Sequence, residues 1–161
     1  MINITETLKN IKILAKKKNL IIATAESCTG GLIAKYLTDL PGSSEFYDSS
    51  CITYSNNSKT LLLDVDSKSI ETYGAVSREV VVEMCNGLLS KNNANLGISV
   101  SGIMGPSSDN TSKSIGLVWA CIKHKDIIEI FQFELNGSRQ QNRETTAKNT
   151  IIKLYDFINE L

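Results

Sequence analysis

Hydrophobic residues follow two different spacings along this chain, one typical of helices and one typical of buried strands. Apolar side chains recur every three to four residues from Ile4 to Leu14, and the segment 3–6, Asn-Ile-Thr-Glu, resembles a capping box at the start of this helix. The wholly apolar run 20–23 is instead typical of a short buried strand. The predicted elements, in chain order, are a helix at 4–14, a strand at 20–23, a helix at 32–40, a strand at 45–54, a short helix ending at 63, a helix capped by Ser77, a strand at 96–101, strands at 115–122 and 127–133, and a last helix whose apolar stripe runs from 147 to 161.

Helices that alternate with strands in this order predict an α/β protein. The last two strands are separated by four polar residues and predict an antiparallel hairpin, while the earlier strands are joined through helices and predict parallel pairing. We therefore expect a three-layer α-β-α sandwich with a mixed, partly parallel sheet, formed by a single domain over residues 1–161. The pattern is weakest between Glu45 and Asn86.

Composition and charge narrow the classes of function. Seventeen Lys and Arg residues balance seventeen Asp and Glu residues, which argues against a nucleic-acid partner. No apolar run approaches the roughly twenty residues that span a bilayer, and the run after Lys18 is too short for a signal peptide, so we expect a cytoplasmic protein with no membrane partner. The four scattered cysteines indicate free thiols, and the single histidine, His124, lies in a predicted hairpin tip. We expect neither a metal nor a cofactor.

The turn 25–31, with the sequence Ala-Glu-Ser-Cys-Thr-Gly-Gly, is the most informative segment. It lies between the first predicted strand and the second predicted helix, where small residues present backbone N–H groups at the positive end of a helix. The turn also carries the hydroxyl of Ser27 and the thiol of Cys28. The N–H groups around Thr29 and Gly30 would hold an oxyanion beside this nucleophile, which indicates acyl transfer.

Other polar side chains follow the neighbouring predicted strands. The second strand ends at Tyr54, with Lys59 one turn later, and the third ends at Ser101 and Gly102. Parallel strands bring their carboxyl ends to one edge of a sheet, where ligands bind in α/β folds, so we expect these residues to gather around Ser27. Burial would lower the pKa of Lys59 towards neutrality and make its amine a base for the serine, with a tyrosine or second serine hydroxyl relaying the proton.

Each candidate also has a purely structural interpretation. These are a helix cap for Ser27 or Thr29, a strand position with a satisfied hydroxyl for Tyr54, a solvated helix position for Lys59, and a tight turn for Ser101 and Gly102. Cys28 could replace Ser27 as the nucleophile, although no histidine is present to activate it. Arg139 and Arg143, at the start of the last helix, either bind a phosphate or lie on the surface.

Five segments occur in the order that is typical of one known family. They are 25–31, then Tyr54-Ser55-Asn56 with Lys59, then Gly74-Ala75-Val76-Ser77, then Ser101-Gly102-Ile103 with Gly105-Pro106, and finally Gly116-Leu117-Val118-Trp119. On these motifs the chain resembles the CinA C-terminal domain, the nicotinamide-nucleotide amidase family of competence/damage-inducible proteins. The resemblance covers nearly the whole chain and corresponds to the stand-alone form of the domain.

The resemblance implies hydrolysis of the carboxamide of nicotinamide mononucleotide to nicotinate mononucleotide and ammonia, without a metal. It implies Ser27 as the nucleophile, assisted by Lys59 and Tyr54, with Ser101 where the family usually has threonine. The candidate substrate-binding residues are Thr29, Gly30, Gly31 and Gly102, with Arg139 for the 5′-phosphate and Arg143 as the second choice.

One loop departs from the family pattern. The family usually reads Gly-Pro-Gly-Gly-Gly-Thr-Pro-Glu-Lys-Pro-Val-Gly, whereas residues 105–116 here read Gly-Pro-Ser-Ser-Asp-Asn-Thr-Ser-Lys-Ser-Ile-Gly. Losing glycines removes positions that can adopt positive φ or approach a ligand closely. The alternative function is therefore a catalytically weakened nucleotide-binding or assembly module of the competence/damage-inducible type. In either case the expected partner is a small-molecule nucleotide, and whether the chain forms a homo-oligomer stays open.

Overall fold

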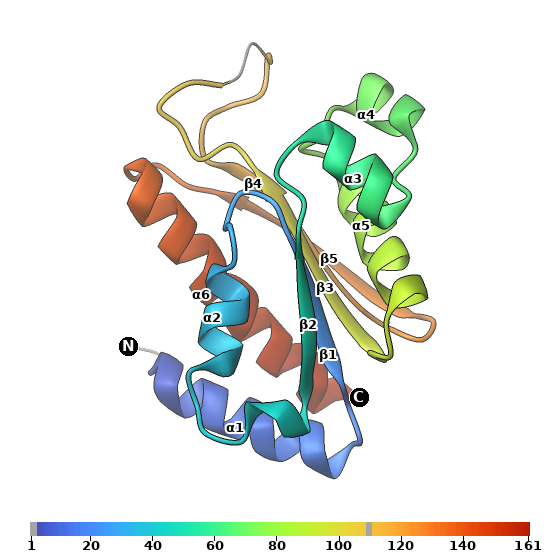
Figure 1. The fold of residues 1–161 in the computed structure, drawn as a ribbon. Coiled ribbons are helices and arrows are strands. Elements are labelled where there is room, and N and C mark those ends of the chain that lie inside the picture. The colour runs from blue at the N-terminus through green and yellow to red at the C-terminus, as the bar shows by residue number, and fades with distance from the viewer. Residues whose placement is uncertain (1–2, 109–110) are drawn as a thin grey trace.

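A mixed sheet with helices on both faces makes up the protein in a computed structural model that describes residues 3–108 and 111–161 (Figure 1). One face is covered by α1 (Ile4–Lys17), α2 (Leu32–Thr38) and α6 (Arg139–Glu160). The other face is covered by α5 (Arg78–Lys91), against which α3 (Asn56–Leu63) and α4 (Ser67–Tyr73) pack. The three-layer α-β-α sandwich expected from the sequence is confirmed.

The sheet contains five strands in the order β2-β1-β3-β4-β5. The strands are β1 (Ile22–Glu26), β2 (Tyr47–Ile52), β3 (Leu96–Gly102), β4 (Leu117–His124) and β5 (Ile127–Glu134). The first three run parallel to one another, and β4 and β5 form the expected antiparallel hairpin against β3. The carboxyl ends of β1, β2 and β3 therefore meet at one edge of the sheet.

The interior strand β1 is buried on both faces, and its alternation decides what each face can hold. Ile22 joins the larger apolar cluster under α1, α2 and α6. Ala23 and Ala25 point to the opposite face and join the cluster around α5, where their small size lets the helix layer approach the sheet. Glu26 shares the face of Ile22, which places its carboxylate under α2.

Several element boundaries differ from those expected. The strand predicted at 20–23 instead spans Ile22–Glu26, because Leu20 donates its N–H to the carbonyl of Ala15 and closes the end of α1. The strand predicted at 45–54 is shorter at both ends, since Ser43–Glu45 forms the 3₁₀ helix η1 and β2 ends before Tyr54.

Two further differences have clear physical reasons. Helix α4 was not predicted, and it buries none of its residues, so it carries no apolar stripe from which it could be recognised. Strand β4 lies two residues later in the sequence than predicted, whereas β5 begins at Ile127 as expected. The turn between them is therefore only Lys125 and Asp126, where Lys125 adopts a positive φ of 53° and reverses the chain. His124 consequently ends a strand, and its Nδ1 lies 2.7 Å from the carbonyl oxygen of Asn95.

Candidate active site

A pocket of about 390 Å³ opens at the carboxyl edge of the parallel strands. It is lined by five segments that are far apart in the sequence, namely residues 27–28, 54–59, 75–76, 101–107 and 139. We call it the Ser27 pocket. The convergence expected from the sequence is therefore present, since Ser27, Tyr54, Lys59 and Ser101 all line this one cavity. Residues 109 and 110 of the loop 105–116 lie outside the described residues.

Ser27 and Lys59 are in direct contact at the floor of the Ser27 pocket. The Nζ atom of Lys59 lies 3.0 Å from the Oγ atom of Ser27. Lys59 is only 1% exposed, although it belongs to the short helix α3 at the edge of the fold. The interpretation of Lys59 as a solvated surface residue is therefore wrong.

Backbone carbonyls hold the amine of Lys59 in place. Its Nζ atom lies 2.9 Å from the carbonyl oxygen of Thr53 and 3.3 Å from that of Tyr54. A neutral amine has two N–H donors and one lone pair, so these two carbonyls can take both donors and leave the lone pair directed at the hydroxyl of Ser27. The geometry thus suits an amine that accepts the serine proton.

Burial lowers the pKa of Lys59 from 10.5 to about 8, because desolvation disfavours the charged ammonium. The nearby thiol of Cys28 opposes this shift weakly. About a tenth of Lys59 is therefore uncharged at pH 7, and this neutral form can act as the general base for a serine.

The thiol of Cys28 is not suited to the role of nucleophile. Desolvation raises the pKa of this buried thiol to about 12, so it stays protonated at physiological pH. The thiolate is the reactive form of cysteine, whereas the Ser27 hydroxyl has a base within hydrogen-bonding distance. The geometry favours Ser27.

Helix α2 is capped by Glu26, a residue that the sequence did not single out. Its Oε2 atom accepts hydrogen bonds from the N–H of Gly31 at 2.9 Å and from the N–H of Ile33 at 3.1 Å. Its Oε1 atom accepts from the N–H of Ala34 at 2.8 Å. The N-cap residue Gly31 makes no side-chain cap, so neither Ser27 nor Thr29 caps the helix. No signal in the sequence indicated this cap, because the strand predicted at 20–23 ends before Glu26.

The expected oxyanion donors need a correction. Gly30 donates its N–H to the carbonyl of Ser27 at 3.2 Å, and Gly31 donates to Glu26, so neither N–H is available to a ligand. The hydroxyl of fully buried Thr29 donates to Glu26 at 2.6 Å, and none of these three residues lines the Ser27 pocket. Within the described residues, the N–H groups of Cys28 and Thr29 have no acceptor oxygen, and of the two residues only Cys28 lines the pocket.

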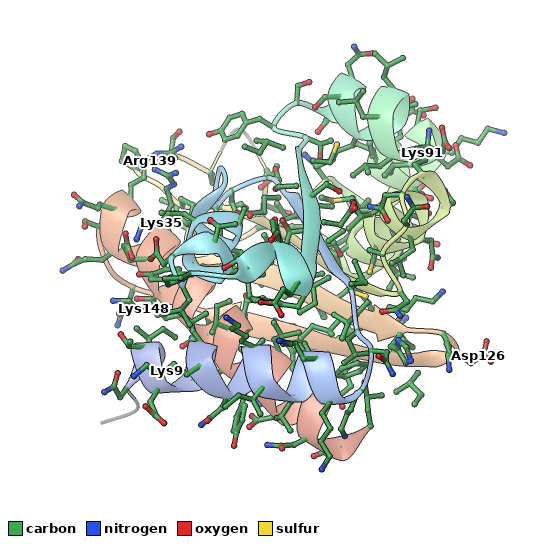
Figure 2. The ribbon with its side chains drawn as sticks, turned by 60° about the horizontal axis from the view of Figure 1, so that its bottom comes forward. Lys9, Lys35, Lys91, Asp126, Arg139 and Lys148 are labelled. Carbon is green, nitrogen blue, oxygen red and sulfur yellow. The ribbon has the colours of Figure 1, made fainter. Side chains whose placement is uncertain are left out.

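Tyr54 and Arg139 form the rim of the Ser27 pocket. The hydroxyl of Tyr54 accepts a hydrogen bond from Nη2 of Arg139 at 2.7 Å, and Nη1 of Arg139 donates to the carbonyl of Gly105 at 2.8 Å. Arg139 begins α6, at the end that projects furthest from α1 (Figure 2). The Tyr54 hydroxyl has no hydrogen bond to Ser27 or Lys59 in the structure; its main-chain carbonyl makes the contact to Lys59 instead. The expected proton relay through the Tyr54 hydroxyl is therefore absent from this geometry.

Ser101 and Gly102 form part of the wall of the pocket. The hydroxyl of Ser101 donates to the carbonyl of Ala75 at 2.8 Å and so holds the segment 75–76 in place. An added Cβ at Gly102 would lie 2.8 Å from a methyl of Val118, which explains why only glycine fits there. Ser101 therefore shapes the pocket and is not bonded to Lys59.

Arg143 lies away from the pocket. Its guanidinium donates to two main-chain carbonyls of the Ser27 turn, those of Cys28 and Thr29. It does not line the Ser27 pocket, so its expected role as an alternative phosphate ligand does not fit this geometry.

Three further features of the described residues concern metal binding, the cysteines and the helices. Across residues 3–108 and 111–161, no group of three or more His, Cys, Asp or Glu side chains could hold a metal ion. The four cysteines are free thiols. Among the described helices, none combines the length and apolarity that crossing a membrane requires.

Comparison with known proteins identifies the family. The sequence profile of the CinA C-terminal domain matches residues 4–158. The chain belongs to the CinA C-terminal domain family. It is 44% identical over 137 residues to a CinA-like protein of Desulfotalea psychrophila, an alignment that covers 84% of this chain but 33% of that protein. The chain thus spans about a third of the length of the curated relatives it matches.

Solved structures of CinA superfamily proteins share the fold. A CinA superfamily protein from Klebsiella pneumoniae superposes with a TM-score of 0.95 at 26% identity, covering 99% of this chain and all of that one. A competence/damage-inducible protein from Agrobacterium tumefaciens superposes with a TM-score of 0.91 at 34% identity, covering 97% of this chain and 95% of that one. The α/β architecture described here is thus that of the CinA superfamily.

Proposed function

We propose that this CinA-family chain is an amidohydrolase that converts nicotinamide mononucleotide into nicotinate mononucleotide and ammonia. The observation that carries the proposal is the 3.0 Å contact between Ser27 Oγ and Lys59 Nζ in a pocket at the carboxyl edge of the sheet. A serine beside a buried lysine of lowered pKa is an activated nucleophile that needs no histidine and no metal.

The first half of the reaction forms an acyl-enzyme. Neutral Lys59 accepts the hydroxyl proton while Ser27 Oγ bonds to the carboxamide carbon, and the carbonyl oxygen becomes an oxyanion. The N–H of Cys28, directly after the nucleophile and without another acceptor oxygen, donates to this oxyanion. Protonated Lys59 then gives its proton to the amide nitrogen as the C–N bond breaks, and the nitrogen leaves as ammonia.

The second half restores the enzyme. A water molecule gives a proton to Lys59, its oxygen bonds to the acyl carbon, and the bond to Ser27 Oγ breaks as the serine recovers its proton. The carbonyls of Thr53 and Tyr54 keep the Lys59 amine beside Ser27 in both protonation states, because each can accept from an amine or from an ammonium.

Arg139 supplies the charge that would recognise the 5′-phosphate. It lies at the pocket rim, and its present partners are a neutral hydroxyl and a carbonyl, either of which a phosphate could replace with a stronger charge-assisted bond. The nicotinamide ring would then occupy the floor near Ser27, and the ribose would span the distance to the rim.

The test compares Ser27→Ala with the wild-type protein and a matched control. Ser44 is exposed and precedes β2, at the opposite edge of the sheet from the pocket, so Ser44→Ala changes a serine without touching the site. Ammonia release from nicotinamide mononucleotide is expected to disappear in Ser27→Ala and to persist in Ser44→Ala, with unchanged melting temperatures. Wild-type turnover in Ser27→Ala would refute the mechanism, and tight binding without turnover by the wild-type protein would favour the binding module.

A further inference from the structure

The turn that carries Ser27 is held from two sides by opposite charges. On one side, the carboxylate of Glu26 accepts hydrogen bonds from the Thr29 hydroxyl and from N–H groups at the start of α2. On the other side, Nε of Arg143 donates to the carbonyl of Cys28 at 3.2 Å, and Nη2 donates to the carbonyl of Thr29 at 2.8 Å. Glu26 precedes the nucleophile in the chain, whereas Arg143 comes from α6, more than a hundred residues later.

Arg143 contacts the turn closely enough to restrict its sequence. Gly30 has a positive φ of 59°, and a Cβ added there would lie 3.0 Å from Nη2 of Arg143. The guanidinium therefore lies directly against the backbone of the turn. Its planar fork fits two consecutive carbonyls, which the single point charge of a lysine cannot contact with the same geometry.

These two hydrogen bonds fix the peptide planes 28–29 and 29–30, which are the second and third after the nucleophile. In a trans peptide the C=O and the following N–H point in opposite directions, so holding the Cys28 carbonyl also fixes the direction of the Thr29 N–H. Holding the Thr29 carbonyl directs the Gly30 N–H, which returns to the carbonyl of Ser27 at 3.2 Å. Arg143 thereby restricts the backbone torsions that set where Ser27 Oγ lies relative to Lys59.

We propose that Arg143 is a positioning residue for acyl transfer at Ser27, acting through the carbonyls of Cys28 and Thr29 rather than on the substrate. This inference rests on the proposed function for the identity of the reaction. The two arginines of α6 then divide the work: Arg139 reaches the pocket rim, and Arg143, one helical turn later, holds the nucleophile turn.

If Arg143 positions the nucleophile and does not bind the substrate, its substitution should change kcat and not KM. A displacement of about 1 Å at a reacting group can lower a rate by about 10²-fold, so Arg143→Met is expected to lower kcat about 10- to 100-fold and to leave KM within about threefold. Arg143→Lys keeps the charge but loses the fork, and it is expected to recover only part of the rate. Lys148→Met is the matched control, because Lys148 is an exposed cation on the same helix (Figure 2).

A second measurement separates positioning from substrate binding and from a general loss of structure. A fluorophosphonate reports on Ser27 without any nucleotide: the Oγ–P bond forms, the P–F bond breaks, fluoride leaves, and Lys59 takes the proton. The rate of phosphonylation in the folded fraction, followed by mass spectrometry, is expected to fall in Arg143→Met by a factor close to that in kcat. Thermal melting measured in parallel gives the folded fraction.

Three results would overturn the proposal. The first is a raised KM with unchanged kcat in Arg143→Met, which would make Arg143 a substrate ligand. The second is an unchanged phosphonylation rate, and the third is a loss of rate that Arg143→Lys repairs completely. If the wild-type protein is phosphonylated at Ser27 but releases no ammonia from nicotinamide mononucleotide, the proposed substrate fails while the role of Arg143 is still tested. If Ser27 is not phosphonylated at all, both proposals fail.

Discussion

The floor and the rim of the Ser27 pocket are built in different ways. At the floor, Lys59 is 1% exposed and is oriented by main-chain carbonyls that the fold itself fixes. At the rim, Tyr54 is 61% exposed, and its hydroxyl is held by the side chain of Arg139. The floor is therefore preorganised before a substrate arrives, whereas the rim contacts are exposed and can be exchanged for contacts to a ligand.

This difference predicts which kinetic constant each region controls. Groups that are fixed and desolvated next to the reacting atoms affect the rate of the chemical step, because their interactions develop in the transition state. Groups that hold a remote part of the substrate with the same strength in the ground and transition states affect KM. Substitutions at the floor should thus lower kcat, and substitutions at the rim should raise KM.

The largest expected effect comes from Lys59→Met at the floor. Methionine fills a similar volume but cannot accept the serine proton, so kcat is expected to fall by about 10³- to 10⁴-fold, the upper range for a lost general base. Lys68→Met, on the exposed surface of α4, is the matched control. Ammonia release measured for both variants checks the prediction, and a Lys59→Met enzyme with near-normal kcat would remove the base from the mechanism.

The floor also shows how far sequence reasoning can reach. The mixed, partly parallel sheet and the gathering of Ser27, Lys59 and Ser101 followed from periodicity and from the rule that parallel strands share a carboxyl edge. Burial of Lys59 did not follow from periodicity, since α3 is short and leaves its neighbours Leu61 and Leu62 exposed. The amine of Lys59 is buried because the loop that contains Thr53 and Tyr54 packs against it.

Hydrogen bonds between different helices, strands and turns explain what the sequence could not predict. The sequence did not indicate that Glu26 caps α2, because this role depends on α2 lying above the end of β1. Arg139 and Arg143 are one helical turn apart and look alike in sequence, yet one reaches the rim and the other reaches the nucleophile turn. The angle at which α6 crosses the sheet determines which carbonyls each guanidinium contacts. This angle cannot be predicted from the spacing of residues along the helix.

At the rim, Arg139→Met is expected to raise KM for nicotinamide mononucleotide about 10- to 100-fold and to change kcat less than threefold. The reason is the loss of a charge-assisted contact to phosphate, which contributes about 1.5–3 kcal/mol. Nicotinamide riboside, which lacks the phosphate, provides the control substrate. Its KM should be nearly the same in the wild-type and Arg139→Met proteins, and an equal rise for both substrates would place the phosphate elsewhere.

The pH dependence of the wild-type enzyme reports on the floor alone. Because burial lowers the pKa of Lys59 to about 8, the active neutral amine becomes more abundant as pH rises and reaches its maximum above that pKa. The value of kcat/KM is expected to rise about tenfold between pH 7 and pH 9 and then to level off. The profile of Arg139→Met should have the same shape at a lower level. A profile that falls over this range would require Lys59 to act as the ammonium.

The smallest expected effect comes from Tyr54→Phe, which sharpens the boundary between the two regions. This substitution keeps the main-chain carbonyl that contacts Lys59 and removes only the hydroxyl that accepts from Arg139. We expect kcat to stay within about threefold and KM to rise by less than about fivefold, because a single exposed hydrogen bond contributes about 1 kcal/mol. Measuring both constants with nicotinamide mononucleotide tests the assignment. If kcat instead fell as far as in Lys59→Met, the Tyr54 hydroxyl would have to join the proton relay during turnover, and the rim would share the chemistry of the floor.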